Sequence, residues 1–332
     1  THNLSISGGG EKYVYYTSLG YTKNSGLLKK NDYDRYNLTA NMSMNPNKKV
    51  KLDLGVMGSY QYSQSPALNS FDPFTYAYNA NPYESPYNED GSYRADETYY
   101  ALGEYNNNRN NTKVIPDGGF NVMREMNETS SKRKNTSVTV RGSIDYSIFS
   151  TFRFVGLASY TNSSNRLREI YNVGTKAALD NRLSVDGSSK KEYASILQNH
   201  IDNESYTLRG HFAYDGQFGT DHSLSLIAGA ELRGSKSDGL YSKRYGYDPV
   251  TGNTITPLPD SPDGVGYEKL KAYLAALDAS SGESWSEQRF ASFYASADYY
   301  FQNRYIVNAS FRTDGSSNFG SDKQFNPNWS LG

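Results

Sequence analysis

Apolar and polar residues alternate along most of this chain. Between Tyr36 and Met44, every second residue is apolar or aromatic, and the residues between them are asparagine, threonine or serine. A period of two is that of a β-strand with different surroundings on its two faces, and it is the wrong period for a helix. The same pattern predicts eleven strands, which begin near Leu4, Tyr13, Tyr36, Val50, Val138, Phe152, Tyr206, Leu224, Phe290, Tyr305 and Asn328.

The predicted connections alternate between short and long. The short ones are Gly8–Lys12, Asn45–Lys49, Phe149–Thr151, Gly216–His222 and Phe301–Arg304, and the long ones are Asn24–Tyr33, Gln64–Arg133, Asn162–Asn203, Ser235–Glu287 and Thr313–Gln324. In an up-and-down meander, alternate connections lie at the same end, so all long loops gather at one end of the sheet. This asymmetry is typical of a transmembrane antiparallel β-barrel with long extracellular loops and short periplasmic turns. A soluble sandwich also alternates, although its strands are usually about 5–6 residues long.

Helical segments are rare in the pattern. No run of apolar residues is long enough for a transmembrane helix, which needs about 18 or more. Only Tyr267–Ser280 carries leucine and tyrosine at helical spacing, so we expect a short helix inside a long loop.

The composition agrees with a membrane sheet and excludes other classes. Hydrophobic residues make up 36% of the chain, which is low for an ordinary soluble core, yet 31 residues are tyrosine. That richness in aromatic residues argues against disorder. A net charge of −1 and the absence of a basic run exclude a nucleic-acid partner, and the absence of cysteine excludes disulfides and thiolate metal sites.

Three stretches carry a resemblance to a known family. They are "HNLSISGGGEKYVYYTSLGYTKNSGLL", "SYTLRGHFAYDGQFGTDHSLSLIAGAEL" and "RFASFYASADYYFQNRYIVNASFRTDGSSNFG". Together they resemble the barrel region of the SusC/RagA family, the TonB-dependent outer-membrane transporters of Bacteroidetes-type bacteria. The resemblance implies that residues 1–332 are part of a single barrel domain and supply about half of a barrel of about 22 strands. We expect the plug, the N-terminal domain and the C-terminal end of the barrel to lie outside this chain.

The same resemblance implies a function. Members of the family import oligosaccharides or oligopeptides across the outer membrane together with a SusD-like surface lipoprotein. TonB drives the import through segments that we expect outside this chain, and outer-membrane lipid surrounds the barrel. The alternative is a non-transport surface protein, an adhesin or a structural barrel, which uses the same loops for binding.

The long loops are rich in aromatic residues. A tyrosine offers a flat apolar face and a hydroxyl group, which suits both sugar rings and protein interfaces. We therefore expect contacts with substrate or with a lid protein from Phe74, Tyr76, Tyr78, Tyr83, Tyr87, Tyr241, Tyr245 and Trp285. The simpler alternative is that these side chains pack the loops against one another.

Charged residues also recur on the polar faces of the strands. The residues expected to face the lumen or a plug are Arg141, Arg209, His211, Glu231 and Arg312. Inside a barrel, such residues usually pair with a plug or line the passage.

Signals for catalysis and metal binding are weak. The chain has four histidines and no Gly-x-Ser-x-Gly motif, so we predict no catalytic residue and no enzyme activity. Acidic clusters at Asn88–Glu97 and Asp260–Gly264 could hold a loop calcium, but neither matches the twelve-residue calcium loop. Turn formation explains their Asp-Gly pairs more simply, so no cofactor and no metal site is predicted.

Overall fold

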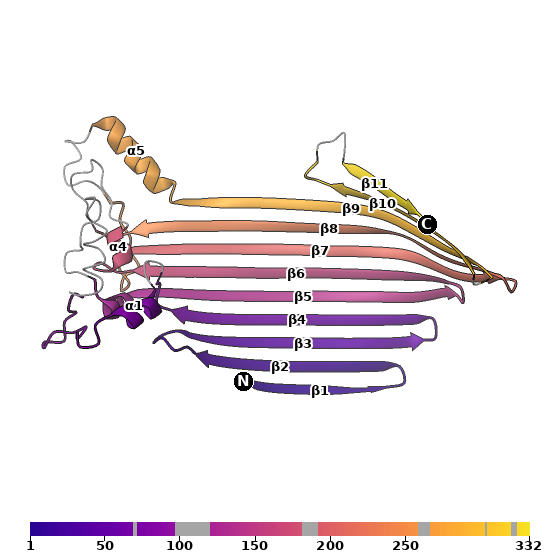
Figure 1. The fold of residues 1–332 in the computed structure, drawn as a ribbon, viewed down its shortest axis with the longest axis horizontal. Helices are drawn as coiled ribbons and strands as arrows, with labels where there is room; N and C mark the ends of the chain where they lie inside the picture. The colour runs from indigo at the N-terminus through magenta and orange to yellow at the C-terminus, as the bar shows by residue number, and fades with distance from the viewer. Residues whose placement is uncertain (69–71, 97–119, 181–191, 258–265, 303, 320–323) are drawn as a thin grey trace.

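A computed structural model describes residues 1–68, 72–96, 120–180, 192–257, 266–302, 304–319 and 324–332. They form a single antiparallel sheet of eleven strands in sequence order, so the fold is the predicted all-β meander and not a sandwich of two sheets (Figure 1). The strands are β1 (His2–Gly10), β2 (Tyr13–Ser25), β3 (Asp32–Asn47), β4 (Val50–Ser65), β5 (Thr129–Phe149), β6 (Phe152–Tyr171), β7 (Ser195–Phe218), β8 (His222–Tyr245), β9 (Ser281–Phe301), β10 (Tyr305–Ser316) and β11 (Phe325–Leu331). The sheet is open, with β1 and β11 at its edges.

The two ends of the sheet differ as the sequence predicts. One end, the turn end, has only the tight connections 11–12, 48–49, 150–151, 219–221 and 302–304. The other end, the loop end, carries the long connections and the four described helices, α1 (Pro73–Asn79), α3 (Val122–Glu128), α4 (Lys176–Asp180) and α5 (Tyr267–Asp278) (Figure 1). Helix α5 is the predicted one. Among the described residues, no helix combines the length and the apolar character needed to cross a membrane.

Strand register separates two faces of different chemistry. On the outer face, Leu54 of β4, Gly142 of β5, Ala158 of β6, Leu208 of β7 and Leu232 of β8 pair in one continuous row. These leucines are about half exposed although they are apolar. An apolar row of this kind is stable when lipid covers it.

Two groups of aromatic residues border this apolar band. Toward the loop end, rings of His2, Tyr21, Tyr36 and Tyr60 follow one another across β1–β4 with centroids 4.9–6.4 Å apart; we call them the loop-end ring. Toward the turn end, Phe152 stacks on Phe212 at 5.5 Å, and Phe301 lies 4.9 Å from His222 and 6.2 Å from Tyr305. Aromatic girdles at both interfaces are a property of transmembrane barrels, so the predicted fold class is confirmed.

The strands extend further toward the loop end than predicted. β6 and β7 continue as far as Tyr171 and Ser195, so much of the predicted loop Asn162–Asn203 is strand, and β8 and β9 similarly shorten the predicted loop Ser235–Glu287. β10 likewise includes Asp314–Ser316, where the sequence suggested the start of a bend. In these extensions both faces carry polar residues, so the alternation that marks a strand is lost.

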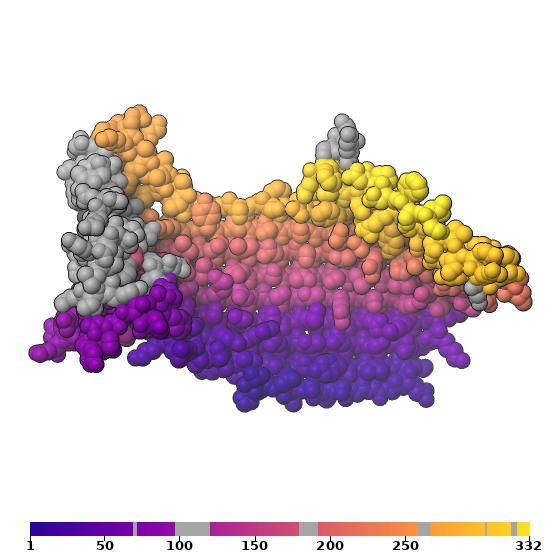
Figure 2. Space-filling view, viewed as in Figure 1, coloured from indigo at the N-terminus to yellow at the C-terminus, as the bar shows by residue number. Residues whose placement is uncertain are grey.

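Burial is concentrated beneath the loops. The buried hydrophobic cluster consists of Ala67, Tyr171 and Ala177, all at the loop end. Figure 2 shows the strands side by side as one broad, continuous surface. The sheet therefore relies on its surroundings, and the loops form the part with a core of its own.

Candidate functional site

The inner face of the sheet is the polar counterpart of the apolar row. A second row lies next to the outer row, one residue further along or back on each strand. It pairs in register across β4–β8 and consists of Asp53, Ser143, Leu157, Arg209 and Glu231. All five residues expected to face the lumen, Arg141, Arg209, His211, Glu231 and Arg312, lie on this face.

Arg312 is the centre of an ordered cluster on that face. Its Nε lies 2.9 Å from both carboxylate oxygens of Asp314, and its Nη2 donates to the Ser292 hydroxyl at 3.3 Å. Ser292 is only 2% exposed and pairs in register with Glu231. Glu231 in turn forms an ion pair with Arg233 at 3.1 Å. Charges here are matched in pairs, so this part of the wall is polar with little excess of either sign.

His211 and Arg141 each make one longer polar contact elsewhere on the same face. The Nδ1 of His211 lies 3.3 Å from the Tyr294 hydroxyl, and Arg141 Nη2 donates to the Asn41 side chain at 3.4 Å. For Arg209, the register supplies a neighbour of opposite charge, since Glu231 is its direct cross-strand partner. Sequence reasoning found the face but not these partners, because they come from neighbouring strands.

Helix α1 begins the cap over the loop end. Asp72 caps it by accepting hydrogen bonds from the backbone N–H groups of Phe74 at 3.0 Å and Thr75 at 3.3 Å, and the Thr75 hydroxyl holds the pKa of Asp72 below its usual value. The Tyr76 hydroxyl donates to the buried carboxylate of Asp96 at 2.6 Å. Burial and that carboxylate raise the pKa of Tyr76, which therefore acts as a neutral donor.

A second part of the cap joins segments that lie apart in sequence. Asn121 accepts from the backbone N–H of Arg124 at 2.8 Å as the N-cap of α3, and its amide donates to the Pro86 carbonyl at 2.7 Å. The rings of Tyr87 and Tyr93 stack at 5.9 Å, and the Arg124 guanidinium lies over Tyr93 at 5.6 Å. This part of the loop is folded by its own side chains.

The eight aromatic residues expected to contact a ligand divide into two groups. Phe74, Tyr78 and Tyr83 are exposed, Tyr83 at 96%, whereas Tyr76 and Tyr87 take part in packing of the cap. Packing within the cap thus accounts for Tyr76 and Tyr87, while contact with a ligand stays a prediction for the exposed Phe74, Tyr78 and Tyr83.

The loop between β8 and β9 shows the same division. Tyr245 is 9% exposed, with the Lys243 ammonium 5.3 Å from its ring. Tyr241 and Trp285 are exposed, but they lie on opposite faces: Trp285 pairs with Asp238 on the outer face, and Tyr241 pairs with Gly282 on the inner one.

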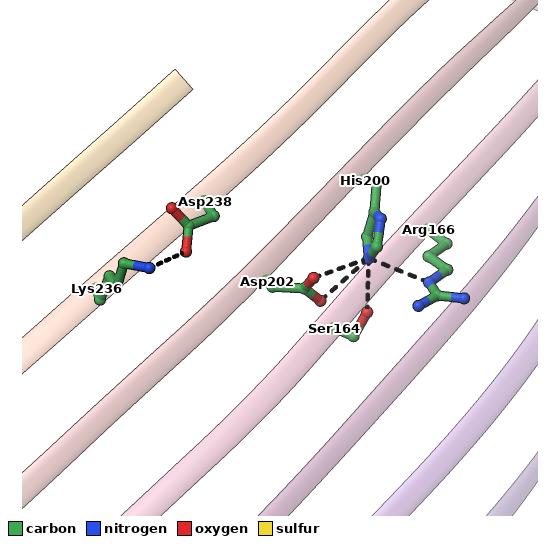
Figure 3. A network of polar contacts seen from close by, with 6 residues as sticks. All are labelled: Ser164, Arg166, His200, Asp202, Lys236 and Asp238. Carbon is green, nitrogen blue, oxygen red and sulfur yellow. Dashed lines mark hydrogen bonds and ion pairs between the residues drawn. The ribbon is translucent and has the colours of Figure 1, made fainter. Parts of the chain in front are cut away.

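The part of the chain seen in the structure contains one Ser-His-Asp group (Figure 3). The Nε2 atom of His200 lies 3.2 Å from the Ser164 hydroxyl and 3.1 Å from the Asp202 carboxylate, and Arg166 Nε points at the same atom from 3.1 Å. A catalytic triad needs the serine and the carboxylate on different ring nitrogens. The arrangement is therefore a surface polar network and not a hydrolytic relay.

No cluster of three or more metal-ligating side chains occurs within the described ranges. In the acidic stretch Asn88–Glu97, described as far as Asp96, Asp90 accepts from the backbone N–H of Ser92 at 2.9 Å and from its hydroxyl at 2.6 Å. These bonds hold the pKa of Asp90 below its usual value and close a turn, as the simpler hypothesis expects. The second acidic stretch, Asp260–Gly264, lies outside the described residues.

Known proteins similar to this chain are receptors and transporters. No family model matches the sequence. Two curated relatives, TonB-dependent receptors P26 and P3 of Formosa agariphila, are 24% and 21% identical over 97% of this chain, which spans 28% of the length of each. Among solved structures, the RagAB peptide importer in its closed-closed state matches 99% of this chain and 33% of its own, with a TM-score of 0.69 and 15% identity.

A more distant solved structure has the same fold. The unliganded ferric citrate transporter FecA matches 99% of this chain and 37% of its own, with a TM-score of 0.52 and 8% identity. The resemblance to TonB-dependent transporters of the SusC/RagA type is thus confirmed along nearly the whole chain, which corresponds to one segment of their barrel wall.

Proposed function

We propose that this chain is the barrel-wall segment of an outer-membrane TonB-dependent transporter that imports oligosaccharides or oligopeptides with a SusD-like lipoprotein. The observation that carries the proposal is the match of all eleven strands to the barrel of a peptide importer, together with the gathering of the long loops at one end. Residues 1–332 would then belong to a single barrel domain, and the function would be transport and not catalysis.

The polar inner face is consistent with a passage filled by a plug domain. Arg141, Arg209, His211, Glu231 and Arg312 offer a wall of donors and acceptors, and a globular plug would contact such a wall through polar side chains. TonB would act on that plug through segments outside this chain.

The exposed aromatic residues of the cap are the proposed contacts for substrate or lipoprotein. Phe74, Tyr78 and Tyr83 offer free ring faces at the loop end. Tyr76, Tyr87 and Tyr245 would instead preserve the shape of the cap, because they are engaged in packing or hydrogen bonds.

The experiment measures uptake in cells that carry the full-length protein. Labelled oligopeptides and oligosaccharides are offered with and without a collapsed proton gradient, and the proteins that co-purify are identified by mass spectrometry. We expect gradient-dependent uptake of one substrate class and recovery of a surface lipoprotein. Binding of cells to surfaces without any uptake would favour an adhesin instead.

A set of variants locates the contact. The triple variant Phe74→Ala, Tyr78→Ala and Tyr83→Ala should lower uptake at least about tenfold, since each aromatic contact contributes about 0.5–1.5 kcal/mol. Phe149→Ala is the matched control, an exposed aromatic residue at the turn end. Unchanged uptake in the triple variant would remove these residues from the proposal.

A further inference from the structure

The outer face changes its chemistry just beyond the loop-end ring. A groove of about 850 Å³ starts at Tyr60, the last residue of that ring, and extends toward the loops. Its lining includes four cationic side chains from two neighbouring strands, Lys132 and Lys134 of β5 and Arg166 and Arg168 of β6, with His200 of β7 beside them.

The four cations face one another without a carboxylate between them. Lys132 is the direct cross-strand partner of Arg168, and Lys134 is that of Arg166. Like charges directly opposite each other destabilise a sheet. The groove lining contains no aspartate or glutamate, and neither lysine forms an ion pair or hydrogen bond with another described residue.

The arginines of the groove also lack a carboxylate partner in direct contact. Arg166 donates to the Nε2 of His200 at 3.1 Å, and Arg168 donates to the Tyr247 hydroxyl at 2.5 Å with its guanidinium 5.6 Å from that ring. The Asp202 carboxylate contacts His200 instead, and it lies two residues further along β7 toward the loop-end ring.

Two cations on the same face outside the groove each have a carboxylate partner. Lys236 of β8 meets Asp238 at 2.7 Å, as Figure 3 shows beside the His200 network. Arg289 of β9 is paired with Glu287 in the same manner. Unlike these two cations, the four cations of the groove have no carboxylate in direct contact.

We infer that this groove binds the phosphate groups of a glycolipid in the outer leaflet. The aromatic ring marks the edge of the hydrocarbon layer, so head groups lie beside the residues immediately beyond it. Lysine and arginine side chains bind phosphate with strong, charge-assisted hydrogen bonds, and arginine does so through two N–H groups. A bound phosphate would also remove the repulsion within each cross-strand pair. The inference rests on the proposed outer-membrane position and is independent of the transported substrate.

The test uses the full-length protein in detergent micelles. Binding of purified lipopolysaccharide, and of the same lipopolysaccharide after removal of its phosphates, is measured by native mass spectrometry. Wild-type protein should retain the phosphorylated form. The double variant Lys134→Gln, Arg166→Gln should bind it about tenfold more weakly for each charge removed. Lys236→Gln is the matched control and should bind like wild type, because Asp238 already compensates that lysine.

Three outcomes would overturn the inference. They are equal binding of the two lipid forms by wild type, full binding by the double variant, and an equal loss in Lys236→Gln, which would indicate diffuse attraction. Displacement of the lipid by inorganic phosphate at matched phosphate concentration would identify a free-phosphate site instead. Flotation with the outer-membrane fraction and uptake by the double variant are measured in parallel, so failure of the proposed transporter is recognised separately.

Discussion

Two rows of residues, one position apart along each strand, show that the two faces of this sheet suit different surroundings. The outer row of Leu54, Gly142, Ala158, Leu208 and Leu232 has no polar group to satisfy and about half of each leucine exposed. The inner row contains Asp53, Arg209 and Glu231; Ser143 donates to Asp53 across two strands, and Arg209 is the cross-strand partner of Glu231. The two faces require different solvents, so the fold depends on lipid on one side and on a polar interior on the other.

The largest expected effect comes from placing a charge on the outer row. Leu54→Lys should impair insertion by about 2–4 kcal/mol, the cost of a lysine near the middle of the bilayer on the lipid face of a barrel. Heat-modifiable migration of the full-length protein after reconstitution into vesicles measures the inserted fraction.

Its neighbour supplies the control for that change. Asp53 lies on the inner face, where Ser143 donates to it at 3.4 Å, so Asp53→Asn keeps a hydrogen-bond acceptor in a wet environment. Insertion of this variant should match wild type. Equal tolerance of both substitutions would contradict the assignment of the two faces.

A smaller effect is expected where two strands approach closely. A Cβ on Gly229 would lie 2.5 Å from the Gly210 carbonyl oxygen and 2.5 Å from the His211 Cβ, so backbone must move. Gly229→Ala should therefore cost about 1–3 kcal/mol, the usual penalty for overpacking. Denaturant unfolding in vesicles gives the change in the free energy of unfolding.

Gly142→Ala is the matched substitution on the outer row. There the added methyl group meets Leu54 Cδ2 at an ordinary 3.5 Å, so little change is expected. Equal changes in the free energy of unfolding for Gly229→Ala and Gly142→Ala would contradict the idea that close backbone contact makes Gly229 the more sensitive position.

The strands could be predicted because the alternation of apolar and polar residues reflects the different surroundings of the two faces of the sheet. It located all eleven strands and placed Arg141, His211 and Arg312 on one face without any structure. The pattern fails at Asn162–Tyr171, where polar residues occupy both faces of the strand. Helices α1, α3 and α4 were missed because 5–7 residues hold too few turns to show a period.

Partners and burial lie beyond what a single sequence reveals. The contact of Arg312 with Ser292 depends on cross-strand register between β9 and β10. Likewise, Tyr76 and Tyr78 are two residues apart in one helix, yet one donates to Asp96 and the other is 90% exposed. Nothing in their sequence context separates them.

Substitutions of these two tyrosines test whether a single hydrogen bond stabilises the cap. Tyr76→Phe removes a donor from the buried Asp96 carboxylate and should lower local stability by about 1–2 kcal/mol, whereas Tyr78→Phe should have no effect. Hydrogen exchange of the backbone amides in α1 measures the local opening. Equal exchange in the two variants would show that the cap does not depend on this bond.

The smallest effect on stability is expected for the charge pair of the inner face. Arg312 and Asp314 are 47% and 45% exposed, so water screens their interaction, and Arg312→Gln should cost only about 0.2–1 kcal/mol. The same change removes a cation from the wall that the proposed plug would contact. We therefore expect a clear loss of uptake although the free energy of unfolding changes little. Lys51→Gln, which breaks an exposed inner-face pair with Asp53 at 3.6 Å near the turn end, is the comparison for uptake and unfolding alike. If Arg312→Gln changes uptake no more than Lys51→Gln does, the inner face acts as a polar wall without a specific contact at Arg312, and the difference between the two rows is one of solvent alone.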